Sequence, residues 1–144
     1  MYIFEIIAVL SCALFAGAAI YINFAEHPAR LECGTELAAT VFEPSYRRAA
    51  VMQASLALVA AISGLIVALS GDSLLWYIGA VLIFSVVPFT FIVIMPTNKQ
   101  LLSPEGSLSV TETHRLLVKW GRLHAVRSSL SLVAAILYVY ALSG

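Results

Sequence analysis

Long apolar stretches without charge alternate with short polar stretches along this chain. Four stretches lack any charged side chain and are 20, 23, 26 and 17 residues long: 6–25, 49–71, 73–98 and 128–144. An α-helix rises about 1.5 Å per residue, so roughly 20 apolar residues cross the ~30 Å hydrocarbon core of a bilayer. The first three stretches reach this length. The fourth reaches it if its helix begins near Leu123, with Arg127 on the first turn and its side chain extended toward the headgroups.

This pattern predicts an all-α membrane protein with four transmembrane helices in one domain, residues 1–144. We expect spans at 3–26, 48–70, 74–95 and 123–143, and longer connections at 27–47 and 96–122. Gly71, Asp72 and Ser73 are typical of a tight turn between antiparallel neighbours. The predicted architecture is therefore an up-down-up-down antiparallel four-helix bundle.

The two longer connections carry helix signals of their own. Residues 31–46 mix polar and apolar side chains, which predicts a short interfacial helix before Pro44 restarts the chain. Ser109 followed by Glu112 is a capping-box signature and predicts a helix that begins there and runs into the last span.

Proline and glycine positions predict local features of the spans. Pro28 disfavours helical geometry at His27, so the first helix should kink or stop there. Gly17 and Gly64 lie among small residues inside apolar stretches and predict close packing between helices.

Composition supports a membrane protein, since 61% of residues are hydrophobic and 11% are charged, against about 25% charged in a soluble domain. Eight Lys and Arg balance eight Asp and Glu, so no basic excess is available to bind nucleic acid. The two cysteines, Cys12 and Cys33, have no metal-type spacing and do not indicate a disulfide framework.

The basic residues are all on one side of the predicted topology. With four spans, both termini lie on one side of the membrane and both longer connections lie on the other. All eight basic residues lie in or at the edge of these connections: Arg30, Arg47, Arg48, Lys99, Arg115, Lys119, Arg122 and Arg127. The positive-inside tendency therefore places the connections in the cytoplasm and both termini outside it, in an inner or plasma membrane.

Polar side chains gather where the helices of such a bundle meet at the cytoplasmic face. The four places are the end of the first span, the start of the second, the end of the third and the start of the fourth, with these residues: Asn23, Glu26 and His27; Tyr46; Thr97 and Asn98; Trp120, His124 and Arg127. Polar residues in a span are costly and mark functional sites. A one-sided cluster beside an apolar bundle predicts a pocket for a lipophilic ligand.

The cluster contains groups suited to moving a proton. Imidazole titrates near neutrality, so His27 or His124 is a candidate base, and Arg127 or Asn98 is a candidate site for oxyanion charge. We expect Asn23, Trp120, Tyr46 and Thr97 to contact the substrate.

Two alternatives remain open for the same residues. The histidines are equally explained as interfacial side chains that bond backbone carbonyls, and Trp120 as part of an aromatic belt. His27, Glu26 and His124 are the candidate ligands if a transition metal binds, although adjacent helical residues point about 100° apart.

Several motifs together resemble one family. They are Gly17-Ala-Ala-Ile-Tyr-Ile-Asn23, Glu26-His27-Pro28-Ala29-Arg30, Pro88-Phe89-Thr90, Met95-Pro96-Thr97-Asn98 and Trp120-Gly-Arg-Leu-His124-Ala-Val-Arg127. The chain resembles the small integral-membrane family of unknown function that includes the fungal anthrone oxygenases. The resemblance implies a four-helix membrane protein and, in the characterised branch, oxygenation of a polyphenolic anthrone to an anthraquinone without an organic cofactor. It also implies His27 or His124 as base, with Asn98, Arg127 and Trp120 as positioning groups.

Two functions follow as hypotheses. The first is a membrane oxidoreductase, oxygenase-like and without an organic cofactor, that acts on a small lipophilic aromatic or quinone-like substrate near the cytoplasmic interface. The second is a non-enzymatic membrane module that binds a hydrophobic ligand or a transition metal and forms a homo-oligomer through its small-residue helix faces.

Overall fold

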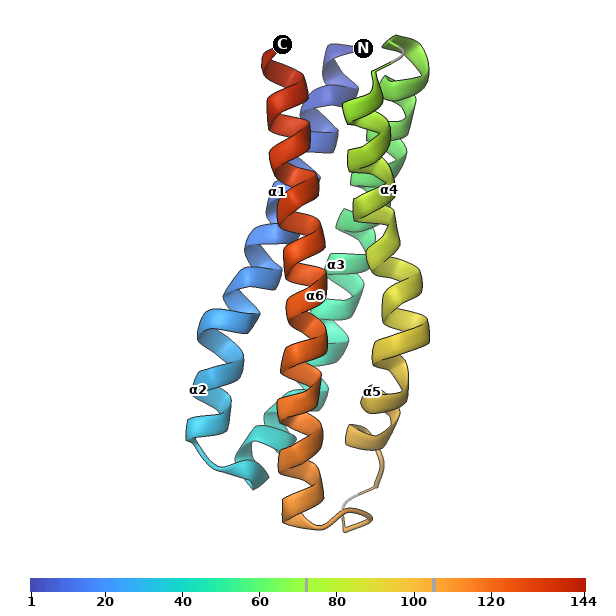
Figure 1. Ribbon diagram of the computed structural model, residues 1–144. Coiled ribbons are helices and arrows are strands. Elements are labelled where there is room, and N and C mark those ends of the chain that lie inside the picture. Colours follow the sequence, from blue (N-terminus) through green and yellow to red (C-terminus); the bar gives the residue numbers. More distant parts are fainter. Residues whose placement is uncertain (72, 105) are drawn as a thin grey trace.

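The computed structural model describes residues 1–71, 73–104 and 106–144 and is almost entirely helical (Figure 1). In chain order the elements are α1 (Tyr2–Tyr21), the π-helix η1 (Ile22–Glu26), α2 (His27–Glu32), α3 (Thr35–Gly71), α4 (Leu74–Phe89), the π-helix η2 (Thr90–Ile94), α5 (Met95–Leu101) and α6 (Val110–Ser143). No β-strand occurs within those three described ranges. The all-α prediction is confirmed.

The elements form four long columns that run alternately down and up. The first column, α1 to α2, descends from the N-terminus, α3 returns, the third column, α4 to α5, descends again, and α6 rises to the C-terminus (Figure 1). Both α1 and α4 pack against α3 and α6, so the columns form a closed ring. This is the predicted up-down-up-down antiparallel bundle. The expected turn centred on Asp72 involves a residue outside the described ranges.

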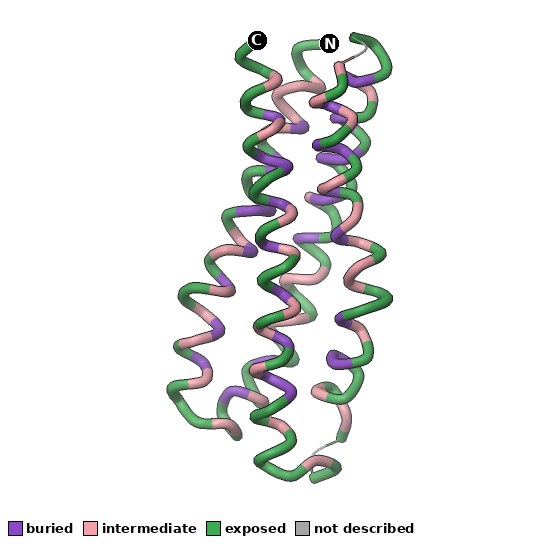
Figure 2. Tube along the Cα trace, viewed as in Figure 1, coloured by how far each residue is buried: buried purple, intermediate pink, exposed green. Residues whose placement is uncertain are grey.

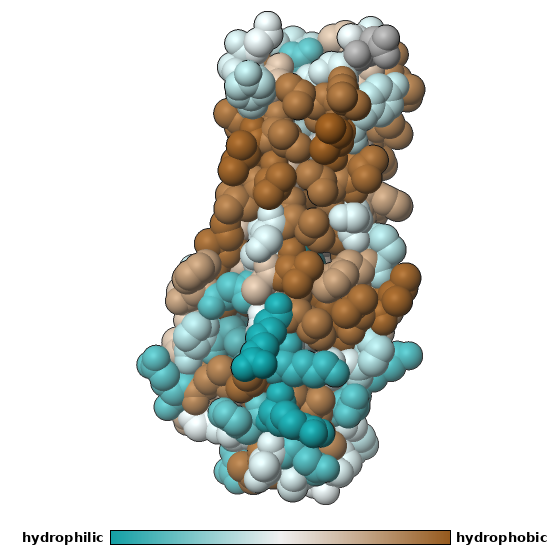
Figure 3. Space-filling view, in the orientation of Figure 1, coloured by the Kyte–Doolittle hydropathy of each residue, from teal (hydrophilic) through white to brown (hydrophobic). Residues whose placement is uncertain are grey.

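All four columns are long and apolar enough to cross a membrane. Their outward faces are exposed along most of their length, whereas buried residues recur on the inward faces (Figure 2). Large apolar side chains occupy many exposed positions, among them Leu14, Leu69, Val81 and Ile136. On the face shown in Figure 3, apolar residues form a broad band below the upper end, and hydrophilic residues gather in the lower part. Since lipid, not water, suits this apolar surface, the protein is an integral membrane protein.

The helices extend past the expected spans at the lower end of the bundle. The connection expected at 27–47 is mostly helical. Only Cys33 and Gly34 lie between the end of α2 and the start of α3. Gly34 has a φ of 95°, a backbone conformation that glycine adopts without a steric cost. In place of a short interfacial helix at 31–46, α3 runs unbroken through Pro44. Buried Ala38 and Phe42 pack in one cluster with α6, and this packing holds α3 helical on the N-terminal side of the proline.

The start of α6 matches the capping-box prediction. The Glu112 N–H donates to Ser109 Oγ over 3.2 Å, and the Ser109 N–H donates to Glu112 Oε2 over 2.9 Å. These two bonds satisfy donors that the first turn of a helix leaves without partners. From this cap α6 runs without a break to Ser143, as expected.

Each π-helix directly precedes a residue–proline pair, His27–Pro28 after η1 and Met95–Pro96 after η2. In both pairs the N–H of the first residue bonds the carbonyl five residues earlier. A proline cannot donate to the carbonyl four residues earlier and its ring clashes with it, and a π turn redirects that carbonyl. The kink or stop expected at His27 is therefore absorbed as a wide helical turn, and the column continues.

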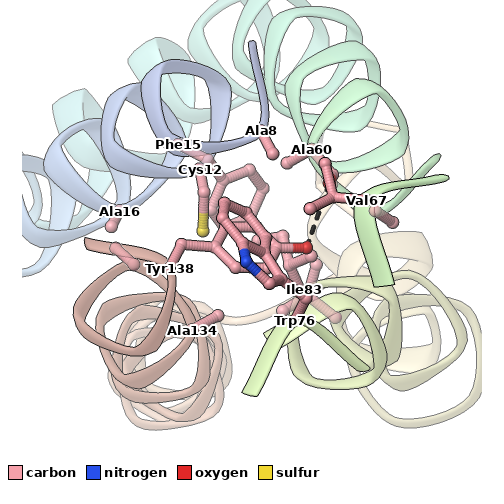
Figure 4. Close-up of a cluster of buried hydrophobic side chains, with 14 of the residues drawn as sticks. Ala8, Cys12, Phe15, Ala16, Ala60, Val67, Trp76, Ile83, Ala134 and Tyr138 are labelled. Atoms are coloured by element: carbon pink, nitrogen blue, oxygen red, sulfur yellow. Dashed lines mark hydrogen bonds between the residues drawn. The ribbon is translucent and has the colours of Figure 1, made fainter. Parts of the chain in front are cut away.

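The upper core is built around Tyr138 of α6. Its ring lies 4.9 Å from that of Trp76, and its hydroxyl donates to the Ala60 carbonyl over 3.1 Å (Figure 4). Gly64 of α3 and Gly79 of α4 leave the space that the Tyr138 ring occupies. The predicted close packing at Gly64 is thus confirmed. At Gly17 the prediction of close packing is wrong within this chain, because this glycine is exposed and an added Cβ would meet nothing within 4 Å.

We predict that Gly64→Ala destabilises the bundle, because the new methyl group would overlap the Tyr138 hydroxyl. Overpacking of this kind costs about 1–3 kcal/mol. The measurement is the midpoint of thermal unfolding in detergent. Gly17→Ala is the matched control and should leave the midpoint unchanged or raise it, since alanine favours helix over glycine by about 1 kcal/mol. Equal midpoints for the two variants would contradict the assignment.

Candidate active site

A cavity of about 170 Å³ lies among the α1–η1–α2 column, α3, the α4–η2–α5 column and α6. Its wall is mainly apolar and aromatic, with Phe15, Phe42, Phe91 and Trp120 among its residues. Seven polar side chains also line it: Arg30, Ser45, Tyr46, Gln53, Thr90, His124 and Arg127. Of the eight site residues predicted from the sequence, Tyr46, Trp120, His124 and Arg127 line this cavity.

Asn23 of η1 holds His124 of α6 in one orientation. Asn23 Nδ2 donates to the Gly121 carbonyl over 3.0 Å, so its Oδ1 is the acceptor atom of the amide. That oxygen lies 2.8 Å from His124 Nδ1 and accepts a second bond from Ser128 Oγ over 2.5 Å. An acceptor at Nδ1 requires a proton on this nitrogen. The neutral imidazole therefore carries its lone pair on Nε2.

Trp120 lies among three other aromatic rings beside this network. It stacks on His124 with ring centroids 4.8 Å apart, and the centroid of the His27 ring lies 5.0 Å from that of Trp120. Phe42 meets Trp120 edge to face at 5.1 Å. Spacing of four residues on α6 puts Trp120 and His124 on one face, as the sequence predicts. His27 bonds the Leu117 carbonyl and His124 bonds Asn23, so the described structure does not pair the two histidines by a hydrogen bond.

His27 is buried against the backbone of α6 and does not line the cavity. Its Nε2 lies 2.9 Å from the Leu117 carbonyl, which can only accept, so this nitrogen carries the proton. Its Nδ1 is buried without a partner among the described residues. The bond to a backbone carbonyl matches the structural alternative for this histidine, and its role as a base stays a prediction.

Arg127 reaches the cavity from α6 and bonds an amide. Its Nη2 donates to Gln53 Oε1 over 2.9 Å, and its guanidinium lies 5.5 Å from the Phe15 ring centroid. Gln53 is 2% exposed and was not singled out from the sequence. Its position in the sequence could have indicated it as a candidate site residue. It is the one amide side chain within the uncharged stretch 49–71, where polar side chains are costly.

Glu26 is occupied by other side chains and does not approach the histidines as a ligand set. Arg30 donates to it, and Ser45 Oγ donates to it over 2.5 Å. In the three described ranges, no three His, Cys, Asp or Glu side chains gather as metal ligands. The metal alternative on His27, Glu26 and His124 therefore has no preformed site in this arrangement.

Thr97 and Asn98 of α5 are buried, at 1% and 0% exposure, but do not line the cavity. The Thr97 hydroxyl and both Asn98 amide atoms have no hydrogen-bond partner in the described parts of the chain. Their predicted roles in binding the substrate and holding oxyanion charge stay predictions. Asn23 bonds His124 and is not on the cavity wall, so its predicted contact with the substrate also stays a prediction.

A sequence model described as anthrone oxygenase matches residues 42–137. This match covers about two thirds of the chain. The chain belongs to the anthrone oxygenase family. Asn23 and His27 lie before the matched range, whereas Trp120, His124 and Arg127 lie within it.

Individual members of the anthrone oxygenase family match shorter parts of the chain. Anthrone oxygenase tpcL of Aspergillus fumigatus is 41% identical over 70 residues, 46% of this chain and 44% of that protein. Anthrone oxygenase ptaC of Pestalotiopsis fici is 35% identical over 74 residues, 43% of this chain and 52% of that protein. The chain thus spans about half the length of these curated relatives. No solved structure matches it.

We predict that Gly121→Ala displaces His27, because the new Cβ would lie 2.8 Å from His27 Cδ2 and 2.9 Å from Nε2. The expected loss of stability is about 1–3 kcal/mol, measured as the unfolding midpoint in detergent. The double variant Gly121→Ala, His27→Ala is the control. Removal of the imidazole frees the space, so the two substitutions together should cost less than the sum of the single effects. Strict additivity would contradict this contact.

Proposed function

We propose that this protein is a membrane oxidoreductase of the anthrone oxygenase type that oxidises a small lipophilic aromatic or quinone-like substrate in the cavity beside His124. One observation carries the proposal. An imidazole with a fixed tautomer and a guanidinium lie three residues apart on α6 and line the same aromatic cavity. The family membership supports the class of reaction.

In the proposed reaction the substrate itself supplies the electrons that reduce O₂. It can do so only after losing a proton, so the reaction requires a base. An anthrone-like substrate has a CH₂ group activated by a conjugated carbonyl and aromatic rings. Loss of one proton from this carbon gives an enolate, which passes one electron to O₂ and then combines with the resulting superoxide as a peroxide. Loss of water from the peroxide leaves a new carbonyl. One substrate and one O₂ thus give one quinone and one water.

His124 Nε2 is the proposed base, with Asn23 as a positioning residue. The Asn23–His124 bond keeps the proton on Nδ1 and the lone pair on Nε2. The imidazolium that forms after proton transfer keeps its bond to Asn23 Oδ1. Arg127 is proposed to hold the enolate oxygen, because fixed cationic donors in a poorly hydrated cavity stabilise developing negative charge. Trp120 and Phe42 are suited to contact an aromatic ring.

We predict that His124→Ala lowers the rate of O₂ uptake with anthrone by about 10²–10⁴-fold, the usual contribution of a general base. The measurement uses an oxygen electrode, the purified protein in detergent micelles and anthrone as substrate. Heat-denatured protein gives the background of spontaneous oxidation. His114→Ala is the matched control, because this exposed histidine lies on the same helix and bonds Thr35 away from the cavity.

Two results would overturn the enzymatic proposal. One is an uptake rate that His124→Ala leaves unchanged while the variant stays folded. The other is binding of anthrone by the wild-type protein with no uptake above background. That second result would support the alternative of a non-enzymatic module that holds a hydrophobic ligand.

We also propose that the cavity end of the bundle faces the cytoplasm and that both termini face outward. The support is that all eight basic residues lie in two segments, 30–48 and 99–127, each of which contains one lower connection of the bundle. At about 1.5 Å per residue, the 34 residues of α6 exceed the hydrocarbon core, so the hydrophilic lower end extends beyond it.

A reporter experiment tests this orientation. Alkaline phosphatase is active only outside the cytoplasm, so its fusion after Gly144 should be active. A fusion after Ser107, in the link before α6, should be inactive and is the internal control. The reverse pattern would overturn the orientation and leave the fold unaffected.

A further inference from the structure

The cavity wall carries a cation without a carboxylate partner. Two guanidiniums line it, and Arg30 is paired with Glu26. Arg127 has no carboxylate within 4 Å among the described residues, and its hydrogen bond goes to the neutral amide of Gln53. A charge held away from water without a counterion is costly, and such charges in proteins are usually paired.

The buried side-chain atoms of the wall that lack a hydrogen-bond partner among the described residues are all donors. Four side chains that line the cavity each have one buried nitrogen without a partner in the described structure: Arg30 Nε, Gln53 Nε2, Trp120 Nε1 and Arg127 Nε. The guanidinium can only donate, so the Gln53 oxygen must be the atom that it bonds. The Gln53 NH₂ group is therefore left without an acceptor. Buried polar groups of this kind normally find partners.

We infer that the cavity binds its aromatic ligand as an oxyanion, a carboxylate or a phenolate, and that Arg127 and Gln53 are its binding residues. The inference rests on the proposed function in placing the ligand in the same cavity. The oxyanion supplies the acceptor atoms and the negative charge that the Arg127–Gln53 wall lacks. His124 Nε2, the one lone-pair nitrogen on the wall, then meets the part of the ligand that carries an acidic hydrogen.

The chemistry of the remaining wall indicates an aromatic acid in preference to a lipid headgroup. Phe15, Phe42 and Trp120 line the cavity next to the donors, and a headgroup has no ring to place among them.

Binding of 2-naphthoate and of its neutral analogue 2-naphthamide tests the inference. The full chain is placed in nanodiscs of phosphatidylcholine, and affinities are measured by equilibrium dialysis. We expect the wild-type protein to bind the acid about tenfold or more tightly than the amide. Equal affinities, or a preference for the amide, would overturn the inference without the use of any variant.

Three variants assign the preference to its residues. Arg127→Met should remove the preference for the acid, and Gln53→Leu should reduce it. Arg122→Met is the matched control, because this exposed arginine lies on the same helix outside the cavity, and it should keep the preference. Without ligand, Arg127→Met should unfold at the same temperature as the wild type or a higher one, since it removes an unpaired charge. A preference that survives Arg127→Met would overturn the assignment.

Two further arms separate this inference from its competitors. Nanodiscs with added phosphatidylglycerol should bind naphthoate as well as before, and competitive loss would assign Arg127 to a lipid headgroup and overturn the inference. Anthrone uptake tests the enzyme separately. If the protein prefers naphthoate to the amide but shows no O₂ uptake with anthrone, the anion site stands and the oxygenase proposal is refuted. If it shows O₂ uptake without that preference, the oxygenase proposal stands and the anion site is refuted.

Discussion

The hydrogen bonds of one amide, Asn23, organise the lower half of this bundle. Its side chain joins η1 to α6 through Gly121, His124 and Ser128. Between packed helices an amide without hydrogen-bond partners would be costly. The bonds therefore set the rotation of the first column against the last, and they also set the tautomer of the imidazole. The same amide thus serves both the fold and the candidate chemistry.

The wide helical turns place this amide. A proline after His27 prevents a regular helix bond, and the π turn that results is the segment that carries Asn23. An equivalent turn lies opposite, before Met95, and Thr90 and Met95 line the cavity. The lower half is broader than the upper half, where Tyr138 fills the space between glycines (Figure 1). One end of the bundle is close-packed and the other contains a cavity with unsatisfied donors, which is the usual relation between a scaffold and a site.

Much of the fold could be predicted because hydrophobic length and charge position are local properties. The four uncharged stretches in the sequence lie in the four observed columns, and the capping box at Ser109 marks the observed start of α6. The extent of α3 through Pro44 could not be predicted in this way. Packing of Phe42 against Trp120, residues 78 positions apart in the chain, outweighs the local preference of proline there. At Gly17 a local pattern predicted a contact that the fold does not make. The glycine lies among small residues in the sequence, but no other part of the chain packs against it.

The sequence by itself determined the number of long helical columns, their antiparallel order and the end of the bundle where polar groups gather, because apolar length and charge act on each segment separately. The tertiary structure decided which of those polar groups meet. It brought Tyr46, Trp120, His124 and Arg127 to one cavity, added Gln53 from α3, and left His27, Thr97 and Asn98 off its wall. Side-chain direction depends on helix rotation, and that rotation is set by contacts between distant segments, such as the bond from Asn23 to His124.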